Sequence, residues 1–198
     1  MKILMLTGVT GAGKSTLFKH IAKKAGDLGF SSELLFSAYH CQNFFKETNF
    51  NSESLYAFYN SIFYFENIEY SKMIGVLFEN SFYNVCLEYH LDSVDVLKIE
   101  ELLQKHHCKQ VVLKLPEDEI YNRSIVTTRI HRKPSWCQYL DGFNMSDEQL
   151  TDLFKEKQEK LLNLTSHSSC PTLTINTSEM AWDLYVEKIN NFWIEQEG

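Results

Sequence analysis

The chain has 198 residues, a formal net charge of −7 and a sequence pI near 5.5. This acidic balance argues against non-specific nucleic-acid binding, because binders of that kind need a basic surface to neutralise phosphates. A chain of this length forms one domain, or one domain with a small lid. It contains no apolar run that approaches the length of a membrane span.

Five cysteines are scattered along the chain without a C-x-x-C pair, at positions 41, 86, 108, 137 and 170. An odd, dispersed set is typical of reduced thiols in a cytosolic protein and does not indicate a disulfide framework or a zinc site. The amino terminus leads directly into an apolar strand, so we expect no signal peptide and a cytoplasmic location. We expect neither a nucleic-acid nor a membrane partner, and the sequence leaves a homodimer open.

The amino-terminal segment combines a strand, a glycine-rich loop and a helix. Residues 2–7 form an apolar run typical of a buried strand, and apolar residues at helical spacing begin at Leu17. Between them lies the stretch 8–16, GVTGAGKST, which fits G-x-x-x-x-G-K-[ST] without a mismatch. A strand before this motif and a helix after it predict a phosphate-binding loop.

Glycines in such a loop adopt positive φ and let the backbone approach a ligand closely. Successive N–H groups then form an anion-binding nest, to which the helix N-terminus adds the positive end of its dipole. We expect Lys14 to reach the β- and γ-phosphates as a catalytic residue, and the Ser15 hydroxyl to bind Mg²⁺. The ATP-binding residues expected in this segment are Gly8, Thr10, Gly11, Ala12, Gly13, Lys14, Ser15 and Thr16.

The remaining strands and helices alternate along the chain. Buried strands are expected at 32–37, 72–78, 110–115 and 171–175, and helices at 51–66, 82–91, 93–105, 117–131, 146–164 and from 177 onward. Ser146 to Gln149 has the form of a capping box, and Thr177-Ser178 are expected to cap the last helix.

Five apolar strands that alternate with helices predict an α/β fold of the P-loop NTPase type. We expect a three-layer αβα sandwich around a five-stranded, mainly parallel sheet with a helical lid. The whole chain, 1–198, is expected to be a single kinase domain. Within it we place an acceptor-binding helical region at about 38–72 and the lid at about 123–145.

Glu79 follows directly after the apolar strand predicted at 72–78. An acid at the carboxyl end of a buried strand beside a phosphate loop normally serves Mg²⁺ or its waters. It can also act as general base on an acceptor hydroxyl. Because ligands gather at strand carboxyl ends in such sheets, we favour a catalytic and metal-binding Glu79 over an ordinary polar strand end.

All three arginines of the chain lie within ten residues, at Arg123, Arg129 and Arg132. A guanidinium fork matches phosphate oxygens and keeps its charge. This clustering predicts a cationic lid in which Arg123 and Arg129 bind ATP, while Arg129 and Arg132 act in catalysis. The alternative is a solvated helix face whose arginines pair with the acids at 117–119.

Segment 31–98 is the expected acceptor side. It holds sixteen of the chain's 27 aromatic residues, and its three lysines stand against nine acids, a balance of −6 without any arginine. A phosphorylated acceptor would favour arginine, so the segment predicts a neutral or cationic small molecule that stacks on aromatic faces. Core packing accounts for most of these aromatics. The residues expected to contact the acceptor are Ser37, Tyr39, His40, Phe58 and Phe82.

The order of these parts resembles the thymidylate kinase and deoxynucleoside kinase group over nearly the full length. The resemblance is carried by GVTGAGKST, the strand that ends at Glu79, the segment LKLPEDEIYNRSIVTTRIHR and the later TLTINTS. It implies that Pro116-Glu117 lead into an arginine-bearing lid and that residues 175–178 border the adenine. It also implies ATP and Mg²⁺ as cofactors.

The chain departs from that group at two places on the acceptor side. Glu79-Asn80 stands where the group usually has an acid followed by an arginine. The second strand ends in Ser37-Ala38-Tyr39-His40, where the group usually places an acid.

These features predict an ATP-dependent kinase that transfers a γ-phosphoryl group to the hydroxyl of a nucleoside or nucleoside-like compound. A nucleoside monophosphate kinase is an alternative that the missing acceptor-side arginine disfavours. A phosphotransferase acting on an antibiotic or another metabolite is a second alternative. From a different class, a regulatory nucleotide-binding ATPase stays open, although the sequence shows no second set of switch-like motifs.

Overall fold

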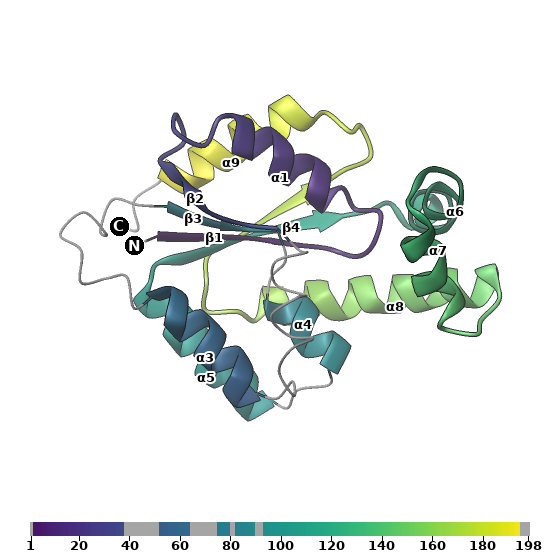
Figure 1. The fold of residues 1–198 in the computed structure, drawn as a ribbon, viewed down its shortest axis with the longest axis horizontal. Coiled ribbons are helices and arrows are strands. Elements are labelled where there is room, and N and C mark those ends of the chain that lie inside the picture. Colours follow the sequence, from purple (N-terminus) through teal and green to yellow (C-terminus); the bar gives the residue numbers. More distant parts are fainter. Residues whose placement is uncertain (1, 38–51, 64–74, 80–81, 90–92, 195–198) are drawn as a thin grey trace.

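A computed structural model describes residues 2–37, 52–63, 75–79, 82–89 and 93–194. The strands are β1 Lys2–Thr7, β2 Phe30–Phe36, β3 Gly75–Phe78, β4 Cys108–Lys114 and β5 Thr172–Asn176. Figure 1 shows these strands as the middle of three layers. One face is covered by helices α1 Lys14–Lys23 and α9 Trp182–Ile194, and the other by α3 Ser52–Phe63, α4 Phe82–Tyr89, α5 Ser93–Lys105 and α8 Asp147–Ser166.

The strand order in the sheet is β2-β3-β1-β4-β5, and every described pair is parallel. The registers bring Met5 opposite Phe78, Thr7 opposite Val112 and Leu113 opposite Ile175. Strand β1 lies in the centre and is buried from Ile3 onward, as expected for an apolar strand covered by helices on both faces. The predicted α/β sandwich with a five-stranded parallel sheet is therefore confirmed.

Helical spacing determines which side chains join the core. In α1, Leu17 and Ile21 are buried one turn apart, and in α9 the buried residues are Tyr185, Val186, Ile189 and Trp193. These two helices also pack against each other over the same face of the sheet. The indole N–H of Trp193 donates a hydrogen bond to the Leu28 carbonyl (3.1 Å), which joins the end of α9 to the turn after α1.

The helix predicted at 117–131 is a succession of three helical types. A 3₁₀ turn (η3, Glu117–Glu119) leads into a π-helical stretch (η4, Tyr121–Val126) and then into α6 (Thr127–His131). The Ser124 hydroxyl in the π-helical stretch donates to the Thr10 carbonyl of the phosphate loop (2.6 Å). A π-helical segment of this kind is often found at a functional site, where it repositions side chains.

A further helix, α7 (Pro134–Asp141), was not predicted and lies with α6 beyond the carboxyl end of the sheet. The capping box at α8 is confirmed: Ser146 accepts from the Gln149 N–H (3.2 Å), and Gln149 accepts from the Ser146 N–H (2.9 Å). None of the described helices combines the length and hydropathy needed to cross a membrane.

The expected cap of the last helix at Thr177-Ser178 is wrong, because α9 begins only at Trp182. Thr177 is fully buried and prolongs the pairing beside β4: its N–H donates to the Lys114 carbonyl (2.9 Å), and so does its hydroxyl (3.2 Å). Tertiary pairing with β4 therefore holds Thr177 out of the helix.

A buried carboxyl group connects α5 to α4 and to the segment between α8 and β5. Glu100 in α5 is 6 % exposed and accepts a hydrogen bond from the Tyr83 hydroxyl of α4. It also bonds the Ser168 side chain and the Ser169 backbone, in the segment between α8 and β5. Burial raises the pKa of the Glu100 carboxyl, and these two hydrogen bonds oppose the rise in part.

We predict that Glu100 makes stability depend on pH. Between its ordinary carboxyl pKa of 4.5 and its raised folded-state pKa, the folded protein binds more protons than the unfolded chain. The free energy of unfolding therefore falls as pH rises through that window. Glu100→Gln removes this contribution. The difference in free energy of unfolding between wild type and variant, measured by urea unfolding from about pH 4 to 7, should therefore change with pH. A stability difference that stays constant over this pH range would contradict the assignment.

Candidate active site

The loop between β1 and α1 has the backbone shape of an anion-binding nest. Gly8, Gly11 and Gly13 all have positive φ, at 153°, 86° and 95°. Gly13 is the N-cap of α1 in the left-handed conformation, so the loop leads straight into the helix N-terminus. N–H groups arranged in this way, together with the helix dipole, favour a phosphate at the carboxyl end of β1.

The Lys14 ammonium lies over this loop. It donates hydrogen bonds to the carbonyls of Gly8 (2.5 Å) and Val9 (3.1 Å). The side chain is half-buried, so its charge stays next to the backbone nest instead of extending into solvent. A cation held at this place can transfer its hydrogen bonds from carbonyl oxygens to phosphate oxygens.

Ser15 and Glu79 come from two different elements beside the loop and contact each other. Ser15 is in the first turn of α1, and Glu79 directly follows β3, the neighbour of β1 in the sheet. The Ser15 hydroxyl donates a hydrogen bond to Glu79 Oε1. Glu79 is 7 % exposed, and its N–H donates to the Phe36 carbonyl (2.8 Å), so the backbone at this carboxylate is fixed by the sheet.

A hydroxyl and a carboxylate in contact fit the ligand preference of Mg²⁺, which takes one or two protein oxygens and completes its shell with water and phosphate. Within the described part of the chain, no group of three or more His, Cys, Asp or Glu could form an all-protein metal cage. The donor set at Ser15 and Glu79 therefore suits a metal that is bound together with a nucleotide.

The lid packs directly on the loop through its backbone. A Cβ atom at Gly11 would lie 2.7 Å from the Arg123 carbonyl oxygen and 2.9 Å from Ser124 Cα. With the Ser124–Thr10 hydrogen bond, this contact places the π-helical stretch against the middle of the loop. Trp182 covers the other end, since a Cβ atom at Gly13 would collide with its indole ring.

The three arginines of the lid lie in different surroundings. Arg123 donates to the Thr177 carbonyl (2.7 Å) and to Glu119 (3.1 Å), and so joins the lid to the segment after β5. Arg129 donates to Asp141 (2.8 Å) and Asp147 (2.9 Å). These hydrogen bonds raise the pKa of the Arg129 guanidinium.

Arg132 is the third lid arginine. Its guanidinium stacks on Trp136, 4.9 Å from the ring centroid, and burial lowers its pKa. The structure thus brings the Arg123 backbone to the loop, while its guanidinium binds Thr177 and Glu119. Arg129 and Arg132 are held by groups of the lid and of the start of α8. Of the acids expected as alternative partners, Glu119 is bonded to Arg123.

The residues predicted to contact an acceptor are only partly within the described chain. Tyr39 and His40 lie outside the described residues, and Ser37 is half-buried just after β2. Phe58 and Phe82 are buried, and their rings contact other rings: Phe58 lies edge-on to Phe78, with 6.4 Å between centroids, and Phe82 adjoins Tyr83 at 3.9 Å.

Three residues near the loop were not predicted from the sequence: Asn84, Ser124 and Trp182. Asn84 in α4 donates to the Gly8 carbonyl (3.0 Å), and the Gly8 N–H makes a longer contact of 3.5 Å to Asn84 Oδ1. The sequence offered one signal for Asn84: it lies early in the helix that follows the strand ending at Glu79. The contact with Gly8 spans 76 positions, however, and depends on how α4 is placed.

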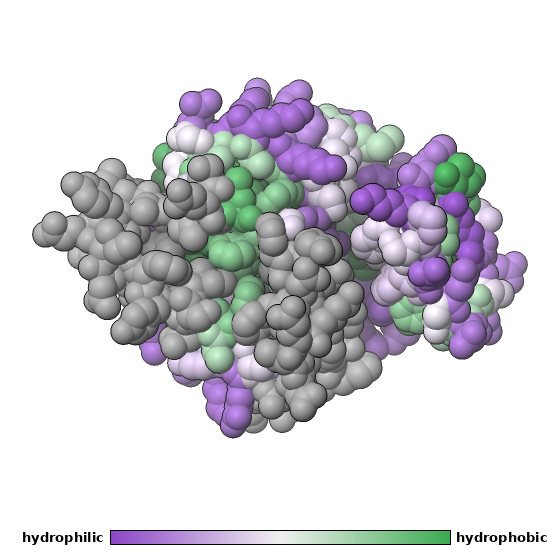
Figure 2. All heavy atoms as spheres, in the orientation of Figure 1, coloured by the Kyte–Doolittle hydropathy of each residue, from purple (hydrophilic) through white to green (hydrophobic). Residues whose placement is uncertain are grey.

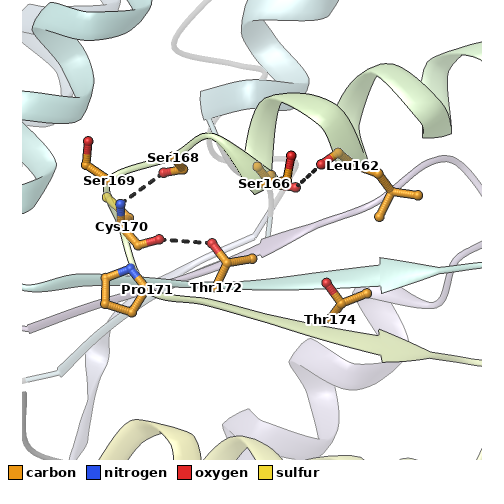
Figure 3. Close-up of a pocket in the computed structure, with 9 residues that line it drawn as sticks. Leu162, Ser166, Ser168, Ser169, Cys170, Pro171, Thr172 and Thr174 are labelled. Atoms are coloured by element: carbon orange, nitrogen blue, oxygen red, sulfur yellow. Dashed lines mark hydrogen bonds between the residues drawn. The ribbon is translucent and has the colours of Figure 1, made fainter.

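A cavity of about 420 Å³ lies elsewhere, between the carboxyl end of α8 and the amino end of β5 (Figure 3). In a parallel sheet this edge is opposite the phosphate loop. Several of its lining hydroxyls are bonded within the chain: Thr172 donates to the Cys170 carbonyl (2.9 Å), and Ser168 accepts from the Cys170 N–H (3.0 Å). We therefore do not place the acceptor there.

Comparison with solved structures finds a similar fold in one protein and weaker similarity to another. The YorR protein from Bacillus subtilis, solved in complex with phosphorylated GDP, superposes with a TM-score of 0.56 at 17 % identity, covering 96 % of this chain and 94 % of YorR. Deoxyadenosine kinase from M. mycoides with bound dATP gives a TM-score of 0.49 at 15 % identity, covering 96 % of this chain and all of that one. The same kinase with the product dCMP and a flexible dCDP gives 0.46 at 13 %.

No protein-family model and no curated protein sequence matches the chain. The comparison with solved structures supports the predicted fold.

We predict that Gly11→Ala destabilises the protein while Gly26→Ala does not. The new methyl group at Gly11 would meet the Arg123 carbonyl at 2.7 Å on a backbone with φ of 86°, whereas a Cβ at Gly26 has nothing within 4 Å. Overpacking and a strained φ each cost about 1–3 kcal/mol. Urea unfolding measures the free energy of unfolding of both variants. Equal values would mean that the lid backbone is not packed closely against Gly11.

Proposed function

We propose that the protein is an ATP-dependent kinase that transfers the γ-phosphoryl group to a hydroxyl of a nucleoside or nucleoside-like small molecule. The observation that carries the proposal is the contact between Ser15, in the phosphate loop, and Glu79, at the end of the neighbouring strand. A phosphate nest, a lysine and a hydroxyl–carboxylate pair for Mg²⁺ are the parts that phosphoryl transfer requires.

The loop residues bind and orient the triphosphate. The backbone N–H groups toward the α1 end of the loop and the N-terminus of α1 hold its oxygens, and Lys14 moves from the carbonyls of Gly8 and Val9 to the β- and γ-phosphates. Ser15 and Glu79 hold Mg²⁺, which when bound neutralises charge on the phosphate oxygens. Glu79 is also the candidate base for the acceptor hydroxyl, because it lies at the same edge of the sheet.

The lid arginines complete the charge neutralisation in this proposal. Arg123 is nearest to the loop, as its backbone contacts Gly11. Arg129 and Arg132 reach a phosphate by leaving the aspartates and the indole that hold them. The exposed ion pairs of Arg129 contribute about 0–1 kcal/mol each, so exchanging them for phosphate oxygens costs little.

The acceptor proposed is a neutral or cationic hydroxyl compound, with a nucleoside as the first choice. Segment 31–98 has a balance of −6 and no arginine, which disfavours a second phosphate there. YorR, which shares the fold, was solved with phosphorylated GDP, which is consistent with a nucleotide as ligand. The experiment that tests the function is a coupled ADP-release screen over nucleosides, nucleoside monophosphates and aminoalcohol metabolites. ADP release that does not depend on any acceptor would favour a regulatory ATPase.

We predict that Glu79→Gln lowers kcat by about a hundredfold or more while ATP affinity changes little, because a base or metal-water role acts on the chemical step. Lys14→Ala should abolish transfer with the fold retained. Steady-state kinetics and calorimetric ATP binding measure these effects, and Glu148→Gln, an exposed acid in the first turn of α8, is the matched control. A normal rate combined with reduced thermal stability would make Glu79 a structural strand-end acid.

We predict that kcat/KM is higher for nucleosides than for their monophosphates under identical ATP and Mg²⁺. A dianionic acceptor would face the excess of acids in segment 31–98 without a guanidinium partner. A hundredfold preference for a monophosphate corresponds to about 2.7 kcal/mol of transition-state discrimination. That result would move the protein to the nucleotide kinases.

A further inference from the structure

The start of the phosphate loop is held by a side chain that the proposed chemistry does not use. Asn84 Nδ2 donates to the Gly8 carbonyl at 3.0 Å, and Asn84 Oδ1 lies 3.5 Å from the Gly8 nitrogen. Gly8 is buried and has just left the sheet, since the β1–β4 register ends at Thr7. The side-chain amide of Asn84 thus pairs with the backbone groups of Gly8 in the way that a neighbouring strand would.

The same stretch of chain also holds the other end of the loop. Glu79 bonds Ser15, and Asn84, five positions later, bonds Gly8. The two hydrogen bonds flank the loop at its first residue and at its serine. The helix that carries Asn84 is fixed in turn, because Phe82, Tyr83, Val85 and Cys86 around it are all buried.

Gly8 O is shared between Asn84 and Lys14. The lysine ammonium donates to this carbonyl at 2.5 Å. When Lys14 turns to a phosphate, the carbonyl loses that donor. A buried carbonyl without a donor costs about as much as a lost hydrogen bond. The Asn84 amide prevents that loss, because its donation to Gly8 does not depend on where the lysine lies.

We propose that Asn84 is a positioning residue for nucleotide binding: it holds Gly8 in the nest conformation and keeps its carbonyl partnered when Lys14 moves to the triphosphate. This inference rests on the proposed function. It makes the affinity for ATP depend on α4, a helix on the acceptor side, through the hydrogen bond of its Asn84 amide to Gly8.

The chain offers a matched control in a second amide of the same kind. Gln158 in α8 bonds both backbone groups of Leu115, where β4 has ended: it accepts from the N–H at 2.8 Å and donates to the carbonyl at 2.9 Å. Gln158 is 5 % exposed. Gln158 therefore holds a strand end with both groups of an amide. Within the described part of the chain its hydrogen bonds go to Leu115 and not to the phosphate loop, so its removal measures the general effect of losing such bonds.

The test compares Asn84→Ala, Asn84→Asp and Gln158→Ala by thermal unfolding and by calorimetric binding of Mg²⁺–ATP without acceptor. We expect both alanine variants to be less stable than wild type, while only the Asn84 variants lose ATP affinity, by about tenfold for one lost hydrogen bond. Asn84→Asp keeps the shape and the acceptor oxygen but loses the donor, so it should bind ATP no better than Asn84→Ala. Asn191→Asp, on the exposed side of α9, should match wild type.

Wild-type ATP affinity in both Asn84 variants would overturn the inference and leave Asn84 a structural residue. An equal loss of affinity in Gln158→Ala would overturn it as well. If an Asn84 variant folds poorly, the ATP-induced rise in its melting temperature replaces calorimetry, and a rise equal to that of wild type counts against the inference. Wild-type protein that binds no ATP, or Lys14→Ala that binds it normally, would instead show that the proposed function has failed.

Discussion

The close packing of three different elements on the three glycines of the phosphate loop is the constraint on which the site depends. The β4 backbone lies against Gly8, the Arg123 backbone lies against Gly11, and the Trp182 ring lies against Gly13. None of these positions has room for a side chain, and all three have positive φ. The nest that would bind phosphate therefore keeps its shape only while the sheet, the lid and the C-terminal helix are all in place.

Electrostatics explains why the carboxylate at the end of β3 belongs to this arrangement. The nest and Lys14 attract a polyanion, whereas Glu79 alone would repel it. A divalent cation held by the carboxylate would remove this repulsion, and the Ser15 hydroxyl, which contacts Glu79, would offer it a second oxygen. An acid beside an anion-binding loop is thus consistent with a nucleotide that binds as its Mg²⁺ complex. A phosphate bound without a metal would be repelled by the same carboxylate.

The face of the molecule in Figure 2 shows how the described surface is divided. The right-hand part, formed by α6, α7 and the nearby end of α8, is largely hydrophilic. The lid thus presents polar and charged groups, and its internal cohesion comes from Arg129 with Asp141 and Asp147 and from Arg132 with Trp136. The same two arginines would have to leave these partners to contact a triphosphate. Movement of the lid and binding of the triphosphate would therefore be linked.

The sequence by itself determined the strands, most helices and the phosphate loop, because these depend on local apolar patterns and on a motif in which glycine, lysine and serine stand at set intervals. The capping box of α8 was equally local. The tertiary structure decided the rest. Thr177 is drawn to the β4 backbone and so cannot cap α9, and the helix after Pro116 becomes π-helical where Ser124 meets Thr10. Asn84 acquires a role only because parallel pairing of β3 with β1 brings the start of α4 beside Gly8, and no local pattern records a contact across 76 residues.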